Sequence, residues 1–450
     1  MEEDKGMSLV SKAVKKVLDF GASESEACLQ IAKTLWIEFD EKIECFKVIE
    51  SSGIGLRAAV GKKIATYSTS VTDENGLIEA ADKAIKIAKV TQEDPEWRHF
   101  NMNFGRSSAE GYYDKSVEEI DYGKVVEKIE SAVQKIREYN NKVKPVRGLL
   151  TINTTKTIIA NCYSEEFERI ETNAMAVVRA KFDDGQEKSI GSEHLETRFW
   201  SKMDLESIAY NAAEKAVKFL RAKPIESCVM PVIIVNDVFA SILGTMLSGP
   251  ITADWVQKGR SPLSGKLGAQ VACERLTLVD NGILYGGIRT RPFDDEGHPT
   301  QKTYVIREGV LENYLYDTYT SIKDGVESTG NALRSGYWQP PQASPSNLIL
   351  EAGDMSLEEI VKSTPRGLLV EDVIGEWLSN PVSGNVNATV THGYLIEDGK
   401  LSMPVKGVTV SGDFYKMILE DLESVGNDVR NNGPYYSPTV KFSKMTLAGK

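Results

Sequence analysis

Histidine supplies many protein metal sites, and this chain of 450 residues contains only four histidines. They are His99, His194, His298 and His392, and no two of them lie within five residues of each other. A metallopeptidase helix needs two histidines about one turn apart with a glutamate beside the first, so that zinc and a general base share one face. No single segment of this chain meets that requirement.

Histidine and carboxylates come together in the segment Glu193-His194-Leu195-Glu196, which has the pattern of a strand. In a strand, His194 and Glu196 share one face and Glu193 points to the other. The pattern favours a solvated strand face, and a weak two-ligand metal pair is the alternative.

The densest charged cluster runs from Arg289 to Gly297 and contains three adjacent carboxylates, Asp294, Asp295 and Glu296. Such a cluster could bind a cation or a peptide amine. A turn that ends at glycine and is held by local ion pairs is the favoured interpretation.

Three glycine-containing segments resemble ligand-binding loops. Residues 328–332 (STGNA) have backbone N–H groups that could hold a carboxylate or a carbonyl, although an ordinary turn is favoured. Residues 53–58 match G-x-G-x-x-A, but a β-branched segment follows where a dinucleotide site needs a helix, which predicts a hairpin strand instead. Residues 259–266 fail the phosphate-loop spacing and lack the hydroxyl that reaches Mg²⁺.

The pattern of apolar residues predicts the elements that must position these side chains. A helix is expected over 7–20, strands over about 25–70 and a helix over about 74–90. The same plan then recurs, with a helix over 117–139, a helix over 205–220 and, between them, strands over 146–161, 166–181 and 187–200. From residue 228, short apolar runs broken by glycine turns predict many strands, with helices near 237–247, 356–363 and 413–423.

We therefore predict an α+β fold, in which N-terminal units of helix and antiparallel sheet precede a β-rich C-terminal sheet or barrel domain. The expected division is an N-terminal domain over 1–90, a linker over 91–116, a middle region over 117–223 and a C-terminal domain over 224–450.

Composition narrows the classes of function. The formal net charge is −12, which disfavours nucleic-acid binding because that binding depends on Lys and Arg neutralising phosphates. The five cysteines are scattered and odd in number, which indicates free thiols and a reducing cytoplasm. The N-terminus has no signal-peptide pattern, and the most apolar region, 229–247, is interrupted by polar residues and Pro231. We expect a cytoplasmic protein that does not enter membranes.

An ordered series of segments resembles the TldD/PmbA family, whose members were once called modulators of DNA gyrase and are now regarded as metallopeptidase subunits. The region of residues 51–70 is similar to the N-terminal signature of that family. In the second half, the matching segments are PFDDEGHPTQKTYVIREGVLENYLYDTYTS (292–321), STGNA (328–332), GYLIEDGKLSMPVKGVTVSGD (393–413), VGND (425–428) and SPTVKFSKMTLAGK (437–450).

The resemblance also indicates which arm of the family this chain is similar to. TldD-like members carry His-Glu-x-x-x-His after the strand that opens the C-terminal domain, and a late cysteine as a further zinc ligand. Here the corresponding segment is VFASILGTMLS (238–248), with Ala240, Ser241 and Thr245 at the three positions, and the last cysteine is Cys273. The chain thus resembles the PmbA arm, also called TldE.

This resemblance implies a subunit without zinc or catalytic residues of its own, paired with a TldD-like partner that holds the zinc and acts on unfolded peptides. A homodimer is a further possibility. The candidates for shaping the peptide groove or the partner contact are Asp294, Asp295, Glu296, Thr329, Gly330 and Asn331.

Two alternatives remain open at this point. One is a free-standing metallopeptidase whose ligands, for example His194, His298 and His392, are brought together by folding. The other is a non-enzymatic regulatory or binding protein, including one with a connection to gyrase and DNA, which the net charge disfavours.

Overall fold

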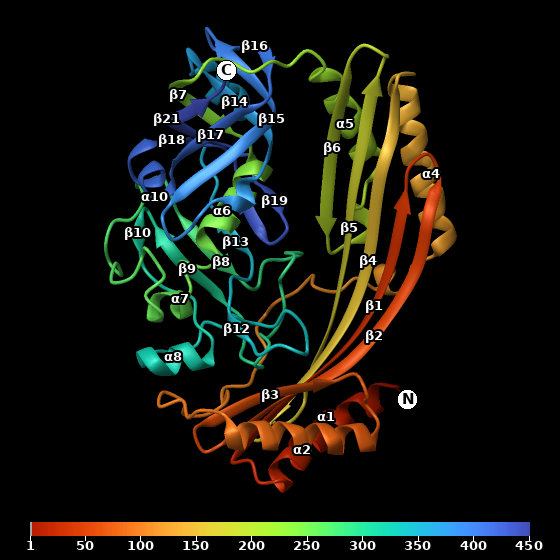
Figure 1. Ribbon diagram of the computed structural model, residues 1–450, viewed down its shortest axis with the longest axis vertical. Helices are drawn as coiled ribbons and strands as arrows, with labels where there is room; N and C mark the ends of the chain where they lie inside the picture. Colours follow the sequence, from red (N-terminus) through yellow and green to blue (C-terminus); the bar gives the residue numbers. More distant parts are fainter. Residues whose placement is uncertain (1) are drawn as a thin grey trace.

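The computed structural model describes the backbone of residues 2–450 and the side chains of residues 9–450. Figure 1 shows two bodies side by side, a long curved sheet with its helices and a C-terminal domain rich in strands. The predicted α+β class is confirmed, because a region of helices and antiparallel sheet precedes a C-terminal sheet that closes into a barrel.

The long sheet has six antiparallel strands in the order β3-β2-β1-β4-β5-β6. Their bounds are β1 Glu24–Phe39, β2 Ile43–Val60, β3 Lys63–Thr69, β4 Val143–Asn161, β5 Phe167–Asp183 and β6 Lys188–Thr197. Strand β1 pairs with β4 from Glu26 opposite Asn161 to Phe39 opposite Gly148. The N-terminal and middle regions of the chain therefore contribute three strands each to one continuous sheet.

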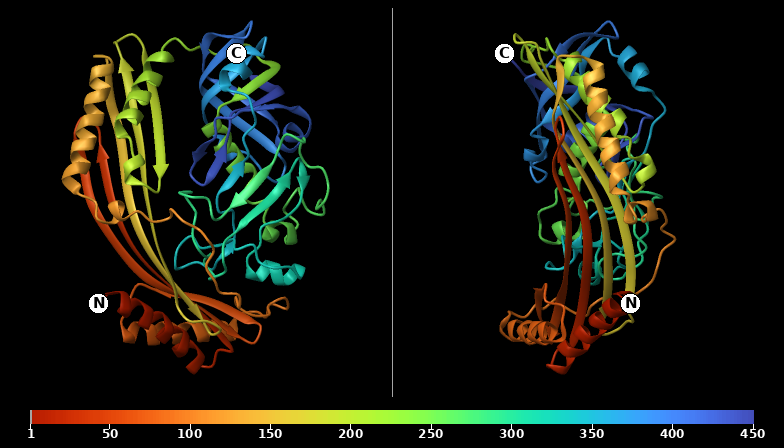
Figure 2. Two further views of the ribbon diagram at one scale, coloured as in Figure 1. Left: turned by 180° about the vertical axis from the view of Figure 1, so that it is seen from behind. Right: turned by 90° about the vertical axis from the view of Figure 1, so that its right-hand side faces the viewer.

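Two pairs of helices pack on the long sheet near its opposite ends (Figure 2). The first pair, α1 (Glu2–Asp19) and α2 (Glu74–Val90), covers the end that includes Leu29, and the second pair, α4 (Tyr122–Tyr139) and α5 (Leu205–Lys218), covers the end that includes Ile37. Both side chains point to the same face of β1, because side chains alternate along a strand. Each large apolar side chain buried in this way contributes about 1.5–3 kcal/mol.

The barrel of the C-terminal domain closes because β14 pairs with both β7 and β15. Its strands are β7 (Cys228–Ile234), β14 (Arg366–Ile374), β15 (Asn385–Glu397), β17 (Val408–Asp413) and β21 (Val440–Ala448), with β16 (Lys400–Val405) beside β15 and β18 (Leu422–Val425) beside β21. Helix α6 (Asn236–Leu247) follows β7 and is largely buried in the same core.

A second sheet of the C-terminal domain has the order β10-β9-β8-β13-β20-β19. Its strands, with the separate pair β11 and β12, are β8 (Leu278–Asn281), β9 (Lys302–Arg307), β10 (Val310–Leu311), β11 (Ala332–Leu333), β12 (Gln342–Ala343), β13 (Leu348–Leu350), β19 (Arg430–Asn432) and β20 (Tyr435–Ser437). The remaining α-helices are α3 (Lys115–Glu118), α7 (Ala253–Gln257), α8 (Thr318–Asp324), α9 (Leu357–Lys362) and α10 (Phe414–Lys416).

The segment predicted as a linker, 91–116, is almost free of regular structure and packs against the loop that carries the charged cluster. Asn101 Nδ2 donates to Glu296 O at 2.8 Å, and Gly105 N donates to Gly297 O at 3.2 Å. Within the described residues, no helix is both long enough and apolar enough to cross a membrane.

Candidate functional site

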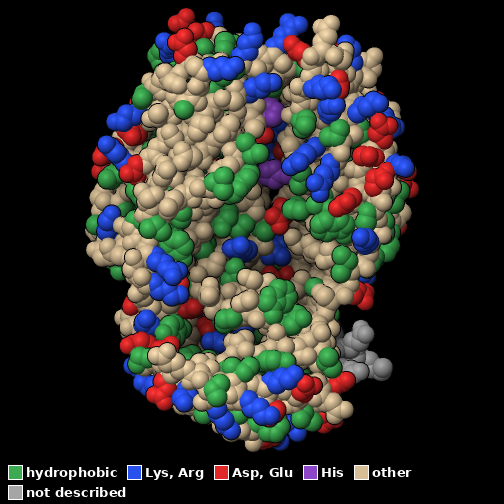
Figure 3. All heavy atoms as spheres, in the orientation of Figure 1, with side chains coloured by type: hydrophobic (Ala, Val, Ile, Leu, Met, Phe, Trp, Pro, Cys, Tyr) green, Lys and Arg blue, Asp and Glu red, His purple; other side chains and the backbone are tan. Residues whose placement is uncertain are grey.

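One candidate site lies at the boundary at which β6, the edge strand of the long sheet, faces α6, β15 and β19 of the C-terminal domain. We call this boundary the seam. Figure 1 shows β6 opposite these elements, and Figure 3 shows that the same face of the molecule is hollowed along this line, where histidine and charged side chains gather. An edge strand has backbone N–H and C=O groups without a strand partner, so side chains of the facing domain can form hydrogen bonds with them.

Three possible metal ligands meet at the seam. The ligand atoms of Glu193, His194 and Asp237 all lie within 4.8 Å of one another. Glu193 and His194 come from β6, whereas Asp237 lies in the first turn of α6, where the helix dipole stabilises a carboxylate. Both carboxylate residues are buried. Glu196 does not join them, because its Oε1 accepts a hydrogen bond from Asn173 Nδ2 at 3.0 Å.

Arg430 of β19 lies between the two carboxylates. Its Nη2 is 2.5 Å from Glu193 Oε1, its Nη1 is 3.3 Å from Asp237 Oδ2, and Nη2 also donates to His194 O at 2.9 Å. Lys215 of α5 approaches the other oxygen of Glu193 at 3.1 Å. Burial would raise the pKa of Glu193, but Lys215 and Arg430 outweigh it and lower that pKa.

This donor set does not fit a zinc ion. Zinc sites use three or four N, O or S donors, and here one histidine stands with two carboxylates that Arg430 and Lys215 already neutralise. A divalent cation would have to approach a guanidinium group at contact distance, which is strongly unfavourable in a partly buried site. Nε2 of His194 is buried and has no hydrogen-bond partner among the described residues.

His392 and His298 do not join this group of ligands. His392 of β15 places Nδ1 3.2 Å from Asp372 Oδ2 and Nε2 3.1 Å from Ile190 O, so it also contacts the edge of β6. His298 places Nδ1 3.0 Å from Pro299 O. Among the described residues, the group at the seam is the one cluster of three possible ligands, and it contains a single histidine.

The three adjacent carboxylates of the charged cluster lie inside the molecule, at the junction of the long sheet and the C-terminal domain. Asp294, Asp295 and Glu296 are at most 2% exposed. Asp295 pairs with Arg169 of β5 and with Arg291, at 3.2 Å for the latter. These pairs hold the pKa of Asp295 far below its usual value, although burial acts in the opposite direction.

Glu296 continues this network into the first two strands. Its Oε1 lies 3.1 Å from Arg57 Nη1 of β2, and the same nitrogen is 3.2 Å from Glu26 Oε1 of β1. Arg334, which follows β11, also pairs with Glu26. The predicted turn and the local pair Arg291–Asp295 are both present. The pairs made by Arg57 and Arg169 are additional to that prediction, connect residues far apart in the chain and join the two bodies.

The polar loop over 328–332 is also largely buried, and its hydrogen bonds lie within the C-terminal domain. Asn331 Nδ2 donates to Asp280 Oδ2 at 2.7 Å, and Thr329 Oγ1 donates to Asn331 Oδ1 at 2.6 Å. Gly330 has a φ of +70°, and a Cβ there would lie 2.3 Å from Pro299 O. The loop thus holds buried polar groups of its own domain, and glycine is needed for both the conformation and the close approach.

The positions singled out on α6 carry no metal-binding side chain. Ala240 is fully buried, Ser241 Oγ donates to Glu376 Oε1 at 3.0 Å, and Thr245 is half-buried. Sequence reasoning missed Asp237 and Arg430 as partners of Glu193. They are 44 and 237 residues away from it in the chain, and no local pattern connects them.

Comparisons with known proteins agree with this architecture. Residues 227–449 match the PmbA/TldA metallopeptidase C-terminal domain, and residues 39–88 match the PmbA/TldA metallopeptidase domain 1. Together these two matches span more than half of the chain. This chain belongs to the PmbA/TldD family. The resemblance drawn from its sequence segments is therefore confirmed.

Two relatives of this PmbA/TldD family chain align over nearly its whole length. The uncharacterized protein MJ0231 of Methanocaldococcus jannaschii is 26% identical over 433 residues, which cover 95% of this chain and 98% of the relative. The metalloprotease PmbA homolog of Haemophilus influenzae is 24% identical over 460 residues, covering 100% and 97%.

Two solved structures share the fold. A protein described as a modulator of a DNA gyrase from Thermotoga maritima has a TM-score of 0.89 and 24% identity, with 98% of this chain and 99% of that chain covered. TldE from Thermococcus kodakarensis has a TM-score of 0.89 and 21% identity, with 98% and 100% covered.

Proposed function

We propose that this chain is a PmbA/TldE-type subunit of a cytoplasmic zinc metallopeptidase complex that degrades or matures unfolded peptides. In this proposal the chain binds no catalytic zinc. It pairs with a TldD-like chain that supplies the metal, and its long sheet and seam form part of the wall around the peptide chamber.

The observation that carries this proposal is the composition of α6 and its surroundings. At the three positions to which the family resemblance assigns zinc ligands and a general base, α6 has Ala240, Ser241 and Thr245. The nearest carboxylate of this helix, Asp237, is already paired with Arg430. Without a metal-bound water and a base to deprotonate it, the chain has no means of activating a nucleophile by that mechanism.

The comparisons support the same subunit type. The Haemophilus influenzae relative named a metalloprotease PmbA homolog aligns with the whole of this chain, so no domain has to be added or removed to relate them. The match to the C-terminal metallopeptidase domain includes α6 and the seam residues Asp237 and Arg430. The chain thus shares the C-terminal domain of the family, and in this proposal its centre lacks the zinc donors.

The proposal is tested by metal content and complex formation. We expect full-length protein purified without chelator to contain almost no zinc per chain, and to cleave an unfolded peptide only after it is mixed with a TldD-like chain from the same organism. Complex formation is measured by light scattering after gel filtration. About one zinc per chain, or peptidase activity of this chain alone, would show that the proposed division of labour is wrong.

A further inference from the structure

The connector between α5 and β7 crosses from the long sheet to the C-terminal domain near the top of Figure 1, and a groove lies beside it at the end of the seam. The connector, the start of β6 and the end of β16 line it, and we call it the connector groove. Its volume is about 560 Å³. A neighbouring cavity of about 400 Å³ shares Lys188 and Lys406 with it, so the two form one continuous depression.

The local backbone holds the connector against the end of β16. Lys223 N donates to Pro404 O at 3.3 Å and Lys406 N donates to Lys223 O at 3.2 Å, so this part of the connector runs beside the end of β16 as an extended strand. Ala222 is buried. Arg221 lies in the turn that follows α5 and Lys223 lies in the bridge beside Val405, and both residues line the connector groove.

The charge of the connector groove is opposite to that of the whole chain. Arg221, Lys223 and Lys406 form no ion pair with any described residue, and Lys188 shares Asp183 with a neighbouring lysine. Among the described residues, Glu187 is the single carboxylate that lines the connector groove. In a chain of net charge −12, unpaired cations in a depression concentrate positive potential at one place, which favours an anionic ligand.

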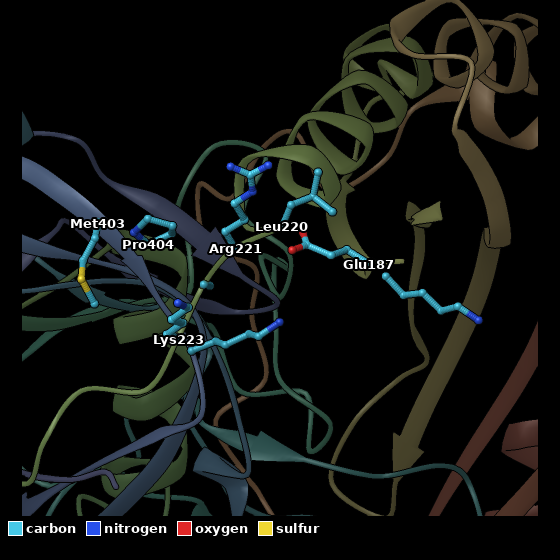
Figure 4. Close-up of a pocket in the computed structure, with 9 residues that line it drawn as sticks. Glu187, Leu220, Arg221, Lys223, Met403 and Pro404 are labelled. Carbon is cyan, nitrogen blue, oxygen red and sulfur yellow. The ribbon is translucent and has the colours of Figure 1, made fainter. Parts of the chain in front are cut away.

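Apolar side chains share the connector groove with these cations. Figure 4 shows Met403 and Pro404 on one side, Glu187 on the other and Arg221 between them. Leu220 adds a further apolar contact. A long polyanion such as duplex DNA would gain the same charge pairs but would be repelled by the acidic surface elsewhere. A short segment that offers both carboxylates and apolar side chains matches both features of the lining.

We propose that the connector groove binds acidic segments of unfolded peptides and so gives this subunit a substrate preference. The proposal rests on the proposed function for the peptide nature of the ligand. Arg221, Lys223 and Lys406 pair with ligand carboxylates, and Leu220 and Met403 contact the apolar side chains between them. Because these charges are exposed to solvent, the interaction weakens as salt rises.

The experiment measures fluorescence anisotropy of a short labelled peptide of alternating Glu and Leu with the full-length chain alone. We expect binding that weakens with salt, and about tenfold weaker binding by the double variant Arg221→Gln/Lys223→Gln. A matched peptide with Gln in place of Glu is expected to bind weakly to the wild type. The matched control variant is Lys83→Gln/Lys86→Gln on α2, which removes the same charge from exposed sites at the far end of the molecule.

Several outcomes would overturn the groove proposal. These are unchanged binding by the groove variant, equal weakening by the groove and control variants, or equal binding of the Glu and Gln peptides. Displacement of the Glu peptide by inorganic phosphate, together with unchanged binding of an all-Glu peptide without Leu, would indicate a small-anion site instead. The peptide-binding assay uses this chain without a partner. Peptide binding can therefore fail while the complex with a TldD-like chain still forms, and the complex can fail to form while peptide binding persists. The results thus distinguish failure of the groove proposal from failure of the proposed function.

Discussion

Arg430 occupies the place at the seam where a bound cation would lie in a metal site. Its guanidinium group bridges Glu193 of the long sheet and Asp237 of the C-terminal domain, and it also donates to the backbone of the edge strand through His194 O. An arginine makes these bonds with a fixed, planar arrangement of donors. The positive charge of one side chain therefore pairs with two buried carboxylates and connects the long sheet to the C-terminal domain.

Removal of this guanidinium group is expected to create affinity for a divalent metal. In an Arg430→Met variant, Glu193, His194 and Asp237 keep their mutual positions but lose their shared cation. We expect Co²⁺ to bind at least about tenfold more tightly than to the wild type, measured by isothermal titration and by the visible absorption of the bound ion.

Two control variants make the metal test specific. Arg307→Met removes an arginine that is about half exposed and pairs with Glu312, and it should leave Co²⁺ affinity unchanged. Adding Asp237→Asn to the Arg430→Met variant should abolish the new affinity. Equal Co²⁺ binding by the wild type and the Arg430→Met variant would show that Arg430 does not exclude the metal.

At the scale of elements, β2 shows why a segment that resembles a nucleotide loop is a strand. A Cβ on Gly55 would lie 1.8 Å from Tyr337 O, and one on Gly53 would lie 2.1 Å from the Tyr337 ring. The glycines are therefore required by the close approach of the loop after β11, and not by a phosphate. The sequence predicted a hairpin strand here, but the partner that requires glycine lies far along the chain.

A Gly55→Ala substitution should separate β2 from that loop. We expect the free energy of unfolding to fall by about 1–3 kcal/mol, because the added methyl group forces the Tyr337 backbone away. Urea unfolding followed by circular dichroism measures the change. Ser52→Ala, on an exposed part of the same strand, should change stability by less than about 0.5 kcal/mol. Similar effects from both substitutions would mean that the contact at Gly55 is not important.

At the scale of the whole molecule, buried carboxylates link stability to pH. Burial raises the pKa of Asp280 on β8 to about 7, although hydrogen bonds from Asn331 and Ser346 partly oppose it. A carboxyl with a raised pKa in the folded state stabilises the fold while it is protonated. That contribution is complete below the unfolded pKa of about 4 and is lost as pH rises through 7.

The substitution Asp280→Asn should therefore flatten the pH dependence. We expect the fall in unfolding free energy from pH 5 to pH 8 to shrink by on the order of 2 kcal/mol relative to the wild type. The control is Asp183→Asn, because Lys181 and the Gly185 N–H lower the pKa of Asp183 to about 2. Its folded and unfolded pKa values both lie below 5, so its profile from pH 5 to 8 should match that of the wild type. An Asp280→Asn profile as steep as the wild type would contradict the prediction.

The sequence by itself determined the local elements and the family. Helix α2 begins where the pattern predicts, since Asp73 caps its first turn and its apolar residues follow one face. The ordered segments from residue 292 onward indicated the family, because each depends on residues that are close together in the chain. Such features are set by neighbouring residues, and neighbours are visible in a single sequence.

Only the tertiary structure decided which distant side chains meet. It paired β1 with β4, so that two regions predicted as successive units form one sheet. It buried Asp294, Asp295 and Glu296 among arginines of other strands, and it placed Arg430 between Glu193 and Asp237. These contacts arise because burying a charge is costly without a partner, and the partner available depends on how the whole chain packs.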